Sequence, residues 1–84
     1  MANNNEFSAR VTRAVKAELA RRDMKGSELV AVLGIGRNAV YSRLRGNAPF
    51  DTEELARIAG HLGISLDTLF ASAALEAVEL RKAA

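Results

Sequence analysis

The chain has 84 residues and a net charge of +2; 49% of its residues are apolar and none is a cysteine. This composition predicts one small globular domain and excludes disulfides and thiolate metal sites, while the single histidine, His61, excludes the usual zinc sites. No apolar run approaches the ~18 residues of a membrane span, and the N-terminus does not resemble a signal peptide, so we expect a cytoplasmic protein that does not bind membranes.

Helical periodicity organises the first half of the chain. Residues 1–6 are polar and we expect them to be disordered. Large apolar residues then recur every fourth position from Phe7 to Leu19, which predicts an amphipathic helix over residues 7–23. The segment "SELVAVL" predicts a second, short helix that ends at Gly34, and a third helix is expected from Arg37 to Arg45, before Gly46.

Clear start and stop signals mark two further helices. Asp51, with Glu54 three residues later, forms a capping-box pattern for a fourth helix that ends at Gly63. Inside this helix stands Gly60, for which we expect close helix packing. Ser65 caps a fifth helix, and the high helix propensity of the following residues favours its continuation toward Arg81.

These elements define an all-α fold, a compact bundle of five short helices without β-type alternation. We expect residues 7–70 to form the domain and residues 71–84 to form a C-terminal helical extension or tail. The large apolar positions that face inward make up the predicted core: Val11, Val15, Leu19, Leu29, Val30, Leu33, Ile35, Val40, Leu44, Leu55, Ile58, Leu62, Ile64, Leu66 and Leu69.

The second and third helices are joined by "GIG", the short glycine-containing turn typical of a helix-turn-helix. Val40 and Leu44 share the inward face of the third helix. At 100° per residue, the opposite face is centred on Ser42, with Asn38 and Arg45 beside it. Arg37 stands at the N-terminus of the helix.

Charge is distributed unevenly along the chain. Residues 1–50 carry nine Lys/Arg against four acids, whereas residues 51–84 carry three against six. A basic half is typical of a nucleic-acid binder, although solvated helix faces explain such an asymmetry equally well. Arginine and asparagine can each make paired hydrogen bonds to base edges, and serine can make one, so Arg37, Asn38 and Ser42 are the candidate base contacts. Tyr41 and Arg43 lie on the flanks of the helix, nearer to phosphates.

The segment "SELVAVLGIGRNAVYSRLRGNAPFDTEELARIAGHLGISLDTLF" resembles the helix-turn-helix domain of lambda-repressor and Cro-like (xenobiotic-response-element-type) transcriptional regulators, and the resemblance covers roughly residues 10–70. Gly26 and Ser27 depart from the Gln-Glu that often opens the second helix of such domains, and Ala39 stands where Thr or Ser is common. The resemblance implies a third helix in the major groove of double-stranded DNA. It also implies phosphate contacts from a set of residues carried over by position: Ser27, Tyr41, Arg43, Arg45 and Asn47.

We therefore expect a sequence-specific DNA-binding regulator, a repressor that acts as a homodimer on a palindromic site. The tail is compatible with a dimer interface through Leu75, Val78 and Leu80, with packing back onto the core, or with fraying. An alternative is an antitoxin-type or protein-interaction module that acts through a protein partner. Because no catalytic constellation appears, we expect neither an enzyme nor a cofactor or metal.

Overall fold

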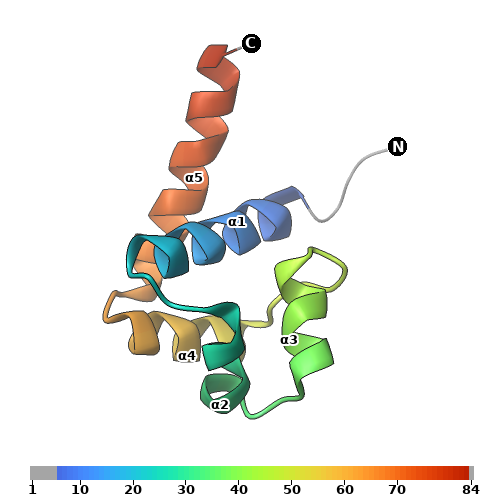
Figure 1. Cartoon of the computed structure of the whole chain (residues 1–84). Helices are drawn as coiled ribbons and strands as arrows, with labels where there is room; N and C mark the ends of the chain where they lie inside the picture. The colour runs from blue at the N-terminus through green and yellow to red at the C-terminus, as the bar shows by residue number, and fades with distance from the viewer. Residues whose placement is uncertain (1–5, 84) are drawn as a thin grey trace.

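Residues 6–83 form five α-helices and one short 3-10 turn (Figure 1). The computed structural model describes residues 6–83, with side chains described for residues 6–75. The residues predicted to be disordered, 1–6, lie outside the described residues except for Glu6, which begins α1. In chain order the elements are α1 (Glu6–Arg21), η1 (Gly26–Glu28), α2 (Leu29–Leu33), α3 (Arg37–Leu44), α4 (Thr52–Leu62) and α5 (Leu66–Ala83).

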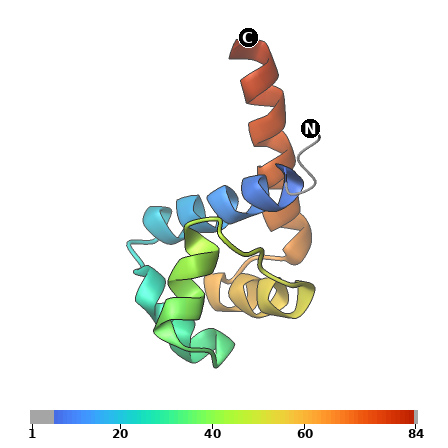
Figure 2. The same ribbon diagram turned by 90° about the vertical axis from the view of Figure 1, so that its right-hand side faces the viewer.

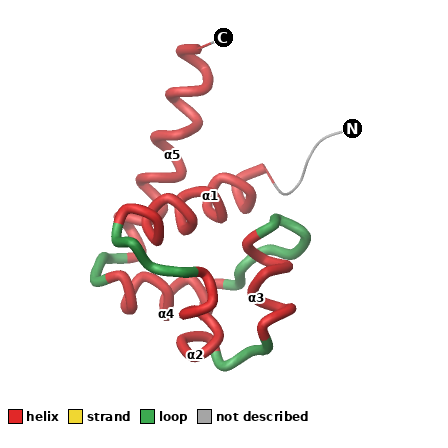
Figure 3. Tube along the Cα trace, in the orientation of Figure 1, coloured by secondary structure: helices red, strands yellow, loops and turns green. Residues whose placement is uncertain are grey.

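Helices α1 and α5 cover one side of the group formed by α2, α3 and α4 (Figures 1 and 2). The rings of Phe7 in α1 and Phe70 in α5 lie 5.8 Å apart, between their centroids. The C-terminal half of α5 projects beyond the other helices in both views. Residues 6–83 contain no strand (Figure 3), which confirms the all-α class and the five-helix bundle.

Several predicted helix bounds differ from the structure, in which α1 begins at Glu6, α3 ends at Leu44 and α5 extends to Ala83. Helix α1 ends at Arg21 rather than Asp23, because Asp23 has a left-handed φ of 57° and the Met24 amide donates back to the Leu19 carbonyl at 2.9 Å. The segment predicted as one helix over residues 27–33 is divided into the 3-10 turn η1 and the short helix α2.

The predicted caps are confirmed. The Asp51 carboxylate accepts from the Glu54 amide at 2.7 Å, and Glu54 Oε1 accepts from the Asp51 amide at 2.9 Å. The Ser65 hydroxyl oxygen accepts from the Thr68 amide at 3.0 Å. Gly63 ends α4 at a φ of 76°, a conformation that side chains with a Cβ rarely adopt.

The core was largely predictable. Most of the expected residues are buried, but Val30, Ile35, Ile64 and Leu66 are only partly buried against the core. Four core residues were missed, and they are either small or lie in a predicted loop: Ala14, Phe50, Ala59 and Ala73. Phe50 immediately precedes the N-cap of α4, where an apolar residue typically packs against the first turns of the helix, so this capping pattern was its available signal.

The expectation of close helix packing at Gly60 was wrong. Gly60 is exposed, and a Cβ built on it would meet no heavy atom within 4 Å.

Among the described residues, no single helix is long and apolar enough to span a membrane. Helix α4 and the first part of α5 reach the necessary length and hydropathy only as a pair, and this pair is bent by 99°.

One buried carboxylate ties α1 to α4. Glu18 is only 6% exposed and forms ion pairs with Arg21 and Arg22. The Arg22 Nε donates to the Leu62 carbonyl at the end of α4, at 3.2 Å. The hydrogen bond from Arg22 outweighs the cost of burial and, with Arg21, lowers the pKa of Glu18 below its ordinary value of 4.5.

Because the pKa of Glu18 is lowered on folding, its contribution to stability is complete above pH 4.5 and is lost as the pH falls toward the lower folded value. Glu18→Gln should therefore reduce the free energy of unfolding at pH 7 by about 1–3 kcal/mol, the scale of a charged hydrogen bond. The variant should also lose less stability than the wild type on acidification. Urea denaturation between neutral and acidic pH measures both effects.

Glu53→Gln is the matched control, because Glu53 is exposed and no described ion pair includes it. It should change stability at pH 7 by less than about 1 kcal/mol, the scale of a helix-dipole effect. Equal effects of the two substitutions would contradict the proposed importance of Glu18.

Candidate nucleic-acid interface

The turn between α2 and α3 is built by its two glycines. Gly34 ends α2 in the left-handed region, with a φ of 67°, and its amide donates to the Val30 carbonyl at 2.9 Å. Gly36 is extended and serves as the N-cap of α3, where its carbonyl accepts from the Val40 amide at 3.1 Å. Ile35, between them, packs partly buried against the core. The turn therefore changes the direction of the chain between α2 and α3, and Ile35 holds it against the core.

The burial of α3 and its C-cap agrees with the predicted faces at the apolar positions and at three of the polar ones. Val40 and Leu44 are buried, whereas Arg37, Asn38 and Arg45 are exposed. Figure 2 shows α3 in front of its neighbours, with one side open to the viewer. Ser42, the expected centre of the outward face, is half-buried.

Arg37 and Tyr41 form a contact that was not predicted from the sequence. The Arg37 guanidinium carbon lies 5.3 Å from the centroid of the Tyr41 ring, within the range of a cation–π interaction. The two residues are four apart, so they are neighbours on the helix surface, and this spacing was an available signal. Tyr41 is half-buried and packs against the core. The contact places the Arg37 cation along one flank of α3.

Arg43 is held on the opposite flank by partners inside the protein. Its Nε donates to Glu54 Oε1 at 3.0 Å, and its Nη1 donates to the Ala39 carbonyl at 3.1 Å. The same Glu54 oxygen accepts from the amide of Asp51, the N-cap of α4. Arg43 therefore connects α3 to the start of α4. This partnership spans eleven positions and a loop, so helical periodicity could not predict it.

The first helix of the motif approaches α3 through Gly26. A Cβ built on Gly26 would lie 2.7 Å from the Leu44 Cδ1 and 3.6 Å from the nearest atom of the Tyr41 ring. Ser27, the next residue and a predicted phosphate contact, is half-buried in η1. Gly26, noted above as a departure from the related regulators, is thus the residue that lets η1 pack directly on α3.

The basic side chains fall into two groups by their partners. Arg10 pairs with Glu6, Arg21 and Arg22 pair with Glu18, and Arg43 pairs with Glu54. Among the residues with described side chains, five cations have no carboxylate partner: Lys16 in α1, Lys25 before η1, Arg37 and Arg45 at the two ends of α3, and Arg57 in α4, whose Nη1 donates to the Leu33 carbonyl at 3.5 Å. Unpaired cations are the ones available to an anionic partner.

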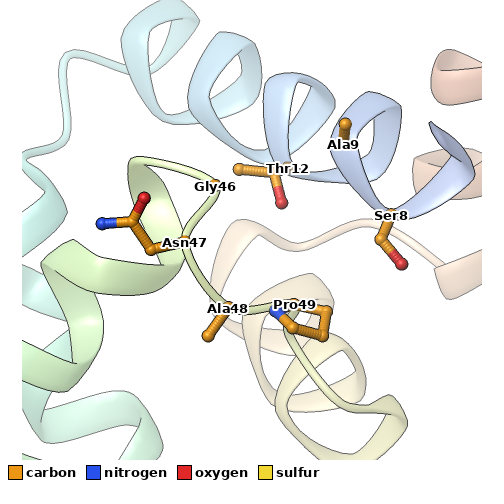
Figure 4. A pocket seen from close by; sticks show the side chains of 7 residues that line it. All are labelled: Ser8, Ala9, Thr12, Gly46, Asn47, Ala48 and Pro49. Atoms are coloured by element: carbon orange, nitrogen blue, oxygen red, sulfur yellow. The ribbon is translucent and has the colours of Figure 1, made fainter. Parts of the chain in front are cut away.

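A small pocket lies between the start of α1 and the loop after α3 (Figure 4). Ser8 and Thr12 border it from α1, and the predicted phosphate contact Asn47 borders it from the loop, with its side-chain amide pointing away from Ser8 and Pro49. Its volume of about 40 Å³ is enough for about one water molecule, so it is no site for a larger ligand.

Two helices joined by a glycine turn, with an exposed polar and basic second helix, define a helix-turn-helix DNA-binding domain. A model of the BetR domain family matches residues 3–80, and the chain belongs to this family. The family consists of DNA-binding regulatory domains and not of enzymes. No curated protein and no solved structure matches the chain.

The close approach at Gly26 predicts that Gly26→Ala destabilises the protein. The added methyl group would overlap with Leu44, so the free energy of unfolding should fall by about 1–3 kcal/mol, as is typical of overpacking. Gly60→Ala is the matched control. It adds the same methyl group in open space within a helix and should stabilise the protein by about 0.5–1 kcal/mol.

Chemical denaturation of both variants measures the difference. A Gly26→Ala protein as stable as the wild type would show that Leu44 can move away without cost.

Proposed function

We propose that the protein is a sequence-specific double-stranded DNA-binding transcriptional repressor of the lambda-repressor and Cro-like kind, with α3 in the major groove. The observation that carries this proposal is how the three arginines of α3 and its C-cap are partnered. Among the described side chains, Arg37 and Arg45 have no carboxylate partner, whereas Arg43 pairs with Glu54. A helix held by an apolar face and free on a polar, basic face meets the needs of base recognition.

Base contacts are assigned to Arg37, Asn38 and Ser42. Arg37 lies at the N-terminus of α3, where a recognition helix enters the groove, and its guanidinium can bind O6 and N7 of guanine. The exposed amide of Asn38 can bind N6 and N7 of adenine. Half-buried Ser42 offers one hydrogen bond and, because it is small, allows the helix to lie close to the bases.

Phosphate contacts are assigned to Ser27, Tyr41, Arg45 and Asn47, which come from η1, from α3 and from the loop after it. Arg45 and Asn47 are exposed, and no carboxylate among the described side chains pairs with Arg45. Arg43 was predicted to contact phosphate as well, but its Nε and Nη1 already have internal partners. We therefore assign Arg43 to holding α3 in position, which supports the contacts of the other residues.

A homodimer is part of the proposal, because a single small domain buries a limited DNA surface. The C-terminal half of α5 projects from the bundle, and Leu75 is 59% exposed (Figure 1). The other residues predicted for this interface, Val78 and Leu80, lie in α5, but their side chains are outside the described residues. A symmetric dimer would bind a palindrome with half-sites about 10 base pairs apart, and repression would follow from blocked access of polymerase.

Arg45→Gln should change the salt dependence of DNA binding, whereas Arg43→Gln should change folding stability. Arg45→Gln removes an unpaired cation. It should make the slope of the logarithm of the DNA-binding constant against the logarithm of the salt concentration shallower by about one, and it should change the free energy of unfolding by less than about 0.5 kcal/mol. Arg43→Gln breaks the tie to Glu54, so it should lower the free energy of unfolding by about 1–3 kcal/mol with an unchanged salt slope. Fluorescence anisotropy at several salt concentrations, with urea denaturation, measures both.

If Arg43→Gln lowers the salt slope as much as Arg45→Gln does, Arg43 binds phosphate and the division of roles is wrong.

Selection of binding sites from random double-stranded DNA tests the function itself. The wild type should enrich a palindromic sequence. Arg37→Ala and Ser42→Ala should each relax the preference at one base pair per half-site and cost about 1–3 kcal/mol on the selected site. Asp67→Ala, an exposed change in α5 away from α3, is the control and should leave the selected sequence unchanged.

Binding that shows no enriched sequence and a flat response to salt would refute the proposal. It would favour the alternative, a protein-interaction module of the antitoxin type, because phosphate contacts always weaken with salt.

A further inference from the structure

An open groove of about 330 Å³ runs between α1 and α3, on the side of Gly26. We call it the α1–α3 groove. Its floor is apolar and is formed mainly by Leu19, Ala20, Met24 and Leu44. Its volume lies at the lower end of the range for small-molecule sites, about 300–1,000 Å³. The groove is thus large enough for a ligand, unlike the pocket beside Asn47.

Two cations line this groove, Lys16 from α1 and Arg45 from the C-cap of α3. Neither has a carboxylate partner among the residues with described side chains, and no acidic residue lines the groove. Like charges at one site repel each other, and an anion placed between them would relieve this repulsion. The charge of the groove therefore selects a negatively charged occupant.

The apolar floor of the groove further limits the chemical class of the ligand. A phosphate or another small inorganic anion would leave the apolar side chains in contact with water, and would gain nothing from them. A hydrocarbon chain would cover them, and Met24 is a flexible side chain that adapts to such partners. We propose that the α1–α3 groove binds an amphipathic carboxylate, such as a medium-chain fatty acid, with its carboxylate between Lys16 and Arg45 and its chain on the apolar floor.

This site would regulate the proposed function, on which its biological meaning rests. Arg45 and Tyr41 line the groove and are also assigned to DNA phosphates. A carboxylate on Arg45 would compete with phosphate for the same cation, so ligand and DNA would each weaken the binding of the other by the same factor. The ligand would then act as an inducer that releases a repressor.

Direct binding of sodium decanoate to the full chain, without DNA, tests the site independently of the DNA-binding proposal. Amide chemical shifts in a ¹⁵N spectrum should change around Ala20, Met24 and Leu44. Decanoate has two more methylenes than octanoate, so it should bind at least about fourfold more tightly, the effect of fully burying one of the two. Decanol, which has the chain without the charge, should bind at least tenfold more weakly.

Two variants test the position of the ligand. Ala20→Phe fills the groove from an exposed position of α1 and should abolish binding, whereas Ala17→Phe, an exposed change on the same helix outside the groove, should not. Lys16→Gln should weaken decanoate binding several-fold, and Lys25→Gln, which removes an unpaired cation outside the groove, should leave it unchanged. Thermal unfolding checks that each variant is folded.

The proposal is overturned if no chain length shifts the groove amides, if decanol binds as tightly as decanoate, or if Ala20→Phe binds decanoate like the wild type. It is also overturned if Lys16→Gln weakens DNA binding while decanoate does not bind at all, because the groove then carries the DNA backbone. If decanoate binds as predicted but random-site selection fails, the ligand site stands and the DNA-binding proposal falls.

Discussion

The close contact between Gly26 and Leu44 brings η1 directly against α3. The proposed function requires the outward face of α3 to be presented to DNA at a defined depth and angle, and the close approach of η1 to α3 contributes to both. With a glycine at position 26, the backbone of η1 lies directly against the Leu44 side chain, where even one methyl group would overlap. Tyr41 fits beside the same glycine, so its half-buried ring borders both the motif and the exposed flank of α3.

The opposite flank of α3 is fixed by polar contacts instead. Arg43 reaches Glu54, and one oxygen of this carboxylate also caps α4 at the Asp51 amide. Glu54 is only 8% exposed, so the pair is shielded from salt and water more than a surface ion pair would be. Helix α3 is therefore held by apolar packing on one side and by a buried carboxylate on the other. Its rotation about its own axis, which decides the residues that face outward, is restrained from both sides.

The sequence predicted the elements of this arrangement better than the contacts between them. Capping pairs such as Asp51 with Glu54 are local, and the apolar stripes follow one helical period, so the helices, their stops and most of the core were predictable. Phe50 was missed because a loop position has no periodicity, and Gly60 was misjudged because the sequence does not show what surrounds a glycine. The partner of Arg43 depends on how α3 and α4 cross, which is tertiary information.

The same distinction explains why a count of charges is a weak predictor of function and a map of their partners is a better one. The nine basic residues in the first half of the chain suggested a nucleic-acid binder without separating structural cations from available ones. Carboxylates at positions 6, 18 and 54 neutralise several of them within the fold, and Glu18 does so at a buried site. The unpaired cations that remain include Arg45 and Lys16, which share one groove, and Arg45 also belongs to the proposed DNA surface. A single cation that serves both a groove and a phosphate contact makes the two sites mutually dependent, because its charge can be neutralised by only one close partner at a time.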